Sequence, residues 1–142
     1  GGEAKCWPLD RFRALVDSLD GREVTWMLGP AECEVRGRAE RSIARQVEAL
    51  GPTLVESDLS EAARRIAGAD LFIGNDAGLT HVAAAMGLPV IAIFGPTDPC
   101  VWRPLGGNVT ALSPASGPGH IDGVTVEQVA QAVVDQGQSR MA

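Results

Sequence analysis

One stretch, residues 69–99, does most to limit how this 142-residue chain can fold. It contains two short apolar runs separated by an alanine-rich segment, and a glycine follows each run. Such runs are typical of buried parallel strands, and alanine favours a helix. Gly87 and Pro89 are suited to end that helix. The order strand, loop, helix, strand predicts one βαβ unit with a right-handed crossover, its elements at 71–73, 78–86 and 90–94.

The loop between the first strand and the helix is the candidate site. In α/β folds, ligands bind at the carboxyl ends of the strands, where this loop opens. Position alone favours Asp76 as the helix N-cap. Gly78 would let a ligand approach the backbone closely, and the free amides at the helix start suit a phosphate. The loop contains Asn75, Asp76, Ala77, Gly78, Leu79, Thr80 and His81.

Other residues could border the same pocket. His81 lies about one turn beyond Asp76, and no second histidine or paired carboxylate gives it metal-ligand spacing, so no metal site is expected. Thr97, in G-P-T-D-P, follows the next strand at the same edge, although Asp98 and the prolines also fit ordinary turn chemistry. Lys5 could serve as a phosphate-binding cation, or be a solvated surface lysine.

Acidic residues follow the strand expected at 24–28. Glu34 or Glu32 could accept hydrogen bonds from ribose hydroxyls, as in dinucleotide folds, or be ordinary surface glutamates of a helix at 32–50. The spacing does not decide between them. There is no G-x-x-x-x-G-K-[ST] and no G-x-G-x-x-G after a strand, so neither a P-loop enzyme nor an ordinary dinucleotide-binding protein is indicated.

The whole chain alternates strands and helices, which predicts a single α/β domain over residues 1–142 with a doubly wound parallel sheet. Further strands are expected at 53–55 and 109–112. Asp58 or Ser60 could cap one helix, and Thr125 could cap a last helix with Val126, Val129, Val133 and Val134 facing inward, which frays from Gly137. Residues 98–107 are expected to form a loop, with Trp102 and Pro104 covering apolar groups.

Composition excludes several classes of protein. Aromatic residues make up 4% of the chain and the net charge is −6, which argues against nucleic-acid binding. The three cysteines are widely spaced, so we expect reduced thiols in a cytoplasmic protein rather than disulfides or zinc. No apolar run reaches membrane-spanning length and no signal peptide is visible.

Three motifs together resemble glycosyltransferase family nine, the lipopolysaccharide heptosyltransferases: G-N-D-A-G-L-T-H, A-A-A-M-G-L-P-V and F-G-P-T-D-P. The opening K-C-W-P is similar to the K-x-W-P segment of that family. The resemblance covers essentially the whole chain but only the C-terminal half of such an enzyme. It implies a Rossmann-like domain, the donor-binding half of a GT-B glycosyltransferase. The acceptor domain, which carries the general base, would then be absent, so no catalytic residue is expected here.

The resemblance also implies an activity: inverting, metal-independent transfer of heptose from ADP-heptose to the lipopolysaccharide inner core, without a cofactor. Asp76, Ala77, Gly78, Leu79 and His81 would line the diphosphate and sugar part of the donor site. Lys5 would neutralise phosphate charge, Glu34 or Glu32 would hold the ribose, and Thr97 would sit at the pocket edge. The lipid-linked acceptor would bind through the missing domain. The full-length protein would be cytoplasmic, with peripheral attachment to the inner membrane as a further option.

In that family's fold a strand precedes the segment matching Gly1, between the strands expected at 24–28 and 71–73. Without it we expect an opened or strained sheet, or pairing with another chain. We also expect this chain alone to bind donor weakly and not to catalyse transfer. Two alternatives stay open: a GT-B-fold epimerase, phosphorylase or other nucleotide-sugar enzyme, and a non-catalytic α/β binding module.

Overall fold

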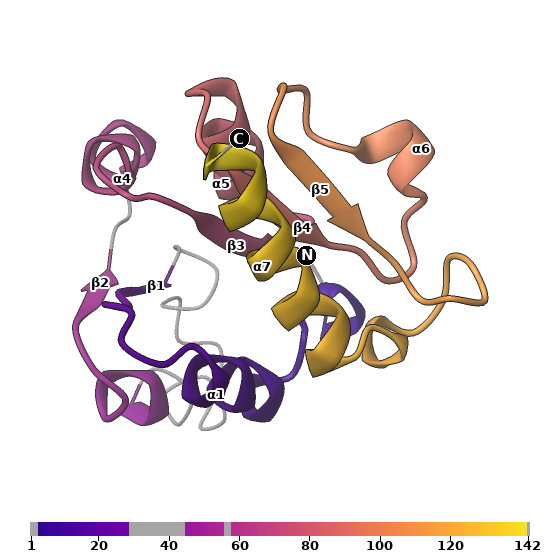
Figure 1. Ribbon diagram of the computed structural model, residues 1–142, viewed down its shortest axis with the longest axis horizontal. Coiled ribbons are helices and arrows are strands. Elements are labelled where there is room, and N and C mark those ends of the chain that lie inside the picture. The colour runs from indigo at the N-terminus through magenta and orange to yellow at the C-terminus, as the bar shows by residue number, and fades with distance from the viewer. Residues whose placement is uncertain (1–2, 29–44, 56–57, 142) are drawn as a thin grey trace.

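Helices and strands alternate along the computed structural model, which describes residues 3–28, 45–55 and 58–141 (Figure 1). The strands are β1 (Trp26–Leu28), β2 (Thr53–Val55), β3 (Phe72–Asn75), β4 (Val90–Ile93) and β5 (Val109–Leu112). The helices are α1 (Leu9–Ser18), α4 (Leu59–Ile66), α5 (Gly78–Ala85), α6 (Pro99–Trp102) and α7 (Val126–Met141), with short 3₁₀ turns η1 (Glu3–Lys5) and η2 (Ile121–Gly123).

The strands form two parallel sheets. One has the order β3-β4-β5 and the other is the pair β1-β2. Figure 1 shows β1 and β2 on the β3 side of the larger sheet, away from β5. In the described part of the chain, no ladder joins β1 to β3. The expected α/β fold with parallel strands is therefore confirmed, and among the described residues the strands form two separate sheets.

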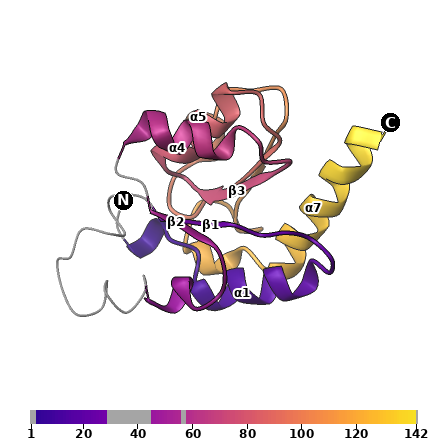
Figure 2. The same ribbon diagram turned by 90° about the vertical axis from the view of Figure 1, so that its left-hand side faces the viewer.

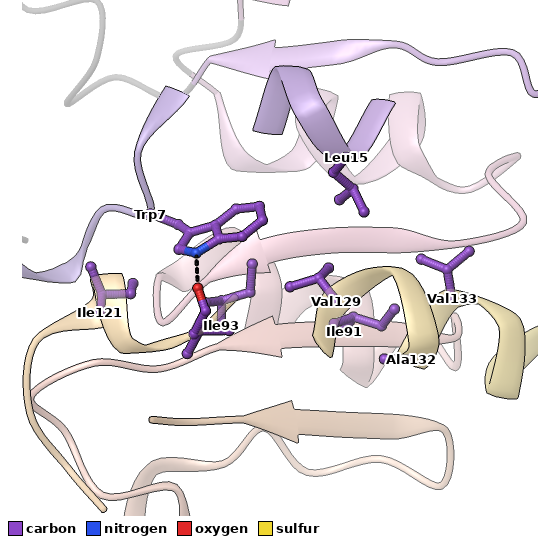
Figure 3. Close-up of a cluster of buried hydrophobic side chains, with 9 residues drawn as sticks. Trp7, Leu15, Ile91, Ile93, Ile121, Val129, Ala132 and Val133 are labelled. Atoms are coloured by element: carbon purple, nitrogen blue, oxygen red, sulfur yellow. Dashed lines mark hydrogen bonds between the residues drawn. The ribbon is translucent and has the colours of Figure 1, made fainter. Parts of the chain in front are cut away.

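Helices cover both faces of the larger sheet, as Figure 2 shows. On one side α1 packs against α7, and on the other α4 packs against α5. Each helical layer contributes to one of two apolar clusters. The first, shown in Figure 3, joins Trp7 and Leu15 to Ile91 and Ile93 of β4 and to the inner face of α7. The second joins Ile66, Ala83 and Ala84 to the other face of β4. Since β4 contributes to both clusters, it is the centre of the core.

Local signals in the sequence placed several helix ends correctly. The Asp58 carboxylate caps α4 by accepting from the Ser60 and Glu61 amides. Thr125 and Gln128 exchange side-chain to main-chain hydrogen bonds at the start of α7, which is a capping box. Gly87 has φ +82° after α5, a conformation that side chains other than glycine's disfavour. These predictions are confirmed.

Other predicted boundaries were wrong. Strand β1 begins at Trp26, because its ladder begins where the Trp26 amide bonds the Pro52 carbonyl. Residues 98–107 are not all loop: the Asp98 carboxylate accepts from the Cys100 amide and starts α6. Helix α7 continues to Met141 instead of fraying from Gly137. Of the helix predicted at 32–50, residues 45–48 are helical, and residues 32–44 lie outside the described part.

Two side chains predicted to be buried are not. Trp102 is 58% exposed, whereas its neighbour Pro104 is buried as expected. Val134 is 47% exposed because it lies outside the inward stripe of α7, to which Val129 and Val133 belong. No helix among the described residues is both long enough and apolar enough to span a bilayer.

Candidate functional site

The site candidates gather where β3 and β4 end. Asp76 directly follows β3, and its amide donates to the carbonyl of Ile93, the last residue of β4. Thr97 comes from the loop after β4, and Lys5 comes from the opening segment of the chain. The topology therefore brings three distant parts of the sequence to one edge of the sheet, as parallel strands do.

The Asp76 carboxylate is the centre of this cluster. Its Oδ2 atom accepts from the Thr97 hydroxyl at 2.7 Å and lies 3.7 Å from Lys5 Nζ. Its Oδ1 atom lies 3.5 Å from His81 Nε2. The side chain of Asp76 is only 11% exposed, whereas those of Lys5 and His81 are 37% and 43% exposed. One largely buried carboxylate thus gathers a hydroxyl, an ammonium and an imidazole, and the last two groups remain accessible to a ligand.

The interpretation of Asp76 as a helix cap was wrong. The residue at the N-cap of α5 is Ala77, and no side chain caps this helix. The carboxylate instead points toward Thr97 and Lys5, so it is not available to the amides ahead of it. The first turn of α5 therefore has no side-chain cap, which leaves its main-chain amides to water or to a ligand.

Main-chain amides are exposed at that helix start. Thr80 and His81 donate their amides to the Ala77 carbonyl, but in the described structure the amides of Ala77, Gly78 and Leu79 have no acceptor. Ala77 and Gly78 are exposed, and a Cβ atom built on Gly78 would meet nothing within 4 Å. The Leu79 side chain packs against the core, so the group of this residue that could contact a ligand is its main-chain amide. Free amides and the positive end of the helix dipole together favour an anion.

Two residues that the sequence placed in this loop without a role prove to organise it. Asn75 Oδ1 accepts from the Trp7 amide at 3.0 Å, and the Thr80 hydroxyl donates to the Asn75 carbonyl at 2.6 Å. Thr80 is 1% exposed and lies so close to Gly74 that a Cβ there would be 2.6 Å from its hydroxyl. The signal in the sequence was limited to Asn75, a polar residue that ends an otherwise apolar strand, and it did not indicate the partners of that residue.

Not every predicted site residue can be placed. Glu34 and Glu32 lie outside the described residues, so the ribose contact stays a prediction. Lys5, Asp76, His81 and Thr97 share one cluster, with Ala77, Gly78 and Leu79 beside it. Within the described ranges, no three His, Cys, Asp or Glu side chains are grouped in a way that could hold a metal ion.

Comparison with known proteins identifies the family. The family model described as glycosyltransferase family 9 (heptosyltransferase) matches residues 1–122. The chain belongs to glycosyltransferase family 9. This family 9 chain is 34% identical over 107 residues to lipopolysaccharide heptosyltransferase 3 of Escherichia coli, covering 74% of this chain and 32% of that protein. It is 33% identical over 115 residues to lipooligosaccharide heptosyltransferase 2 of Haemophilus influenzae, covering 78% and 33%.

Solved structures of the family have the same fold. The E. coli ADP-heptose lipopolysaccharide heptosyltransferase II matches with a TM-score of 0.79 and 27% identity, over 99% of this chain and 44% of that one. The E. coli heptosyltransferase WaaC with ADP matches with a TM-score of 0.78 and 27% identity, over 95% and 41%. The chain thus spans about a third of its curated relatives and less than half of these structures.

Proposed function

We propose that this chain is the donor-binding part of a heptosyltransferase that transfers heptose from ADP-heptose to the lipopolysaccharide inner core. The observation that carries the proposal is the uncapped, exposed start of α5 beside Lys5, with Asp76 and His81 at the same edge of the sheet. The family and the names of the relatives support the reaction, and a related WaaC structure holds ADP. Another WaaC structure holds ADP-2-deoxy-2-fluoro heptose.

The reaction requires a good leaving group. When the bond between the sugar and the diphosphate oxygen breaks, its electron pair stays on ADP, and the negative charge of ADP increases. The amides of Ala77, Gly78 and Leu79 would donate to the diphosphate oxygens, and the Lys5 ammonium would neutralise their charge. Both would be in place before the donor arrives, so little reorganisation would accompany bond breaking. This is the chemistry of a transferase that stabilises a departing diphosphate with its own donors.

Asp76 and His81 would act on the sugar side of the site. The Asp76 carboxylate would repel a phosphate if it were unpaired, but Lys5 and Thr97 both contact its Oδ2 atom. His81 has its imidazole at the surface one turn into α5, where it can donate to a hydroxyl or a phosphate oxygen. The Thr97 hydroxyl donates a hydrogen bond to Asp76, so Thr97 would lie at the pocket edge and hold the Asp76 carboxylate in position. Glu34 or Glu32 would hold the ribose.

Titration calorimetry with ADP, GDP and UDP tests the proposal. We expect ADP to bind, and Gly78→Val to abolish that binding, because a branched side chain would fill the space that the diphosphate needs. Gly68→Val is the matched control, since a Cβ on Gly68 also meets nothing within 4 Å and the residue precedes β3, whereas the site follows the carboxyl end of that strand. ADP binding unchanged in Gly78→Val would contradict the proposed site.

The same titration separates this proposal from the alternatives. Preference for UDP would favour another nucleotide-sugar enzyme, and no binding of any nucleotide would favour a non-catalytic module. We further propose that residues 1–142 form one donor domain and that the acceptor and the general base belong to another part of the full enzyme. The enzyme would then work in the cytoplasm or peripherally at the inner membrane. Detectable transfer to acceptor by this chain alone would refute that division of labour.

A further inference from the structure

We propose that Asn75 is a positioning residue that fixes Lys5 at the diphosphate subsite. This inference rests on the proposed function, because it assigns a supporting residue to the same site. Asn75 is the last residue of β3, and Lys5 belongs to the opening 3₁₀ turn, so the two are far apart in the sequence. The link between them is the main chain of Trp7.

The opening segment is held at two points. The amide of Trp7 donates to Asn75 Oδ1 at 3.0 Å. Its indole Nε1 donates to the Val124 carbonyl at 2.9 Å, which is the dashed line in Figure 3. Trp7 is 2% exposed, so its ring is anchored in the core. The hydrogen bond from its main-chain amide to Asn75 then fixes the position of the backbone next to the ring. Lys5 is only two residues before Trp7, so the hydrogen bond between Trp7 and Asn75 limits where the Lys5 backbone and its ammonium group can lie.

Lys5 needs such support because its own contact is weak. Its ammonium lies 3.7 Å from Asp76 and the side chain is 37% exposed, so the ion pair is screened by water. Exposed pairs contribute little, and a free lysine side chain has many rotamers to lose when it binds. Fixing the backbone beside Lys5 before the ligand arrives reduces that entropic cost.

The amide of Asn75 suits this role better than a carboxylate. Its oxygen accepts from Trp7 without bringing a second negative charge beside Asp76. The main-chain carbonyl of Asn75 is already taken by the Thr80 hydroxyl, which ties the same residue to α5. Asn75 therefore holds both the cation-bearing segment and the amide-bearing helix against the end of β3.

A double-mutant cycle tests the inference with ADP and adenosine as ligands. We expect Lys5→Ala to weaken ADP binding about tenfold. Asn75→Ala should weaken ADP binding by a similar factor, and the double variant should be no worse than Lys5→Ala alone. Adenosine carries no phosphate, so its binding should not change in any of the three. Asn75→Asp should keep the Trp7 contact but bind ADP less well than wild type, with the deficit reduced by salt.

Gln136→Ala is the matched control for a general loss of stability. It removes two hydrogen bonds, to the Asn108 carbonyl and the Thr110 hydroxyl, at the amino end of β5. Additive effects of Asn75→Ala and Lys5→Ala, equal losses for ADP and adenosine, or the same loss in Gln136→Ala would each overturn the inference.

A second measurement keeps the two proposals apart. Backbone order parameters of Lys5 should fall in Asn75→Ala and stay high in Gln136→Ala, whether or not a nucleotide is present. If the wild-type chain binds no ADP, the proposed function fails. An unchanged Lys5 order parameter in Asn75→Ala would instead refute the positioning role alone.

Discussion

Strands β3 and β4 belong to one βαβ unit and are both largely apolar, yet their surroundings differ. All four residues of β4 are 0% exposed, whereas every residue of β3 is only partly buried. The reason is pairing: β4 lies between β3 and β5, while β3 has β4 on one side and no ladder on the other among the described residues. The more open strand carries the site at its carboxyl end, and the buried one supplies the scaffold.

Hydrogen exchange should show this difference most strongly. In β3 the Phe72 and Asp76 amides donate toward β4, so by alternation the Ile73 amide faces the open edge. The β4 amides are all paired within the sheet, and they should exchange at least about 1,000-fold more slowly than that of Ile73, since they open only with the whole domain. NMR-detected hydrogen exchange at low protein concentration measures the exchange rates of the Ile73 amide and the β4 amides. Equal protection at Ile73 would mean that its edge is paired, and protection that rises with concentration would identify a second copy as the partner.

A matched pair of truncations should sharpen the comparison. Ile73 and Ile91 are register partners across the β3-β4 ladder and pack into the same apolar cluster. Ile91→Ala leaves a fully enclosed cavity and should cost about 3–5 kcal/mol of unfolding free energy. Ile73→Ala should cost about 1–2 kcal/mol, because part of that side chain is already in water. Urea unfolding measures both, and equal losses would show that the two strands are equally embedded.

Glycines beyond the two strands offer a third comparison. A Cβ on Gly95, after β4, would be 2.7 Å from Ile121 Cβ and 3.0 Å from the Ile121 amide nitrogen. Gly95→Ala should therefore destabilise the fold by about 1–3 kcal/mol through overpacking. Gly78→Ala, after β3, meets open space and should be neutral or stabilising by up to about 1 kcal/mol. A large loss in Gly78→Ala during denaturant titration would mean that the helix start is packed rather than open.

The sequence was informative where structure depends on neighbouring residues. The apolar runs, the Asp58 cap and the glycine after α5 are local signals, so the strands and most helix ends could be predicted. The apolar residues of β3 and β4 did not show that β4 would be the more buried strand, because burial depends on which strands lie on either side.

The contacts of the site were hidden for a related reason. Asp76 has the sequence position of a cap, but its partner Thr97 is 21 residues away. The Trp7 to Asn75 bond spans 68 residues. Only the folded sheet edge brings such pairs together, whereas the family motifs pointed to the same edge without giving these contacts.

The smallest effect is expected at the contact that joins the ends of the two strands. The Thr97 hydroxyl, after β4, donates to the Asp76 carboxylate, after β3, at 2.7 Å. Thr97→Val keeps the shape and removes the donor, so it should lower the unfolding free energy by about 1–2 kcal/mol. Without this donor the Asp76 carboxylate should repel the diphosphate of ADP more strongly. ADP binding should therefore weaken by a small factor, and added salt should reduce this loss because it screens the repulsion. Thr97→Ser is the control, since it keeps the hydroxyl and should retain ADP affinity. If Thr97→Val bound ADP as well as wild type did, the ends of β3 and β4 would serve the ligand independently, and the site would belong to β3 and α5 alone.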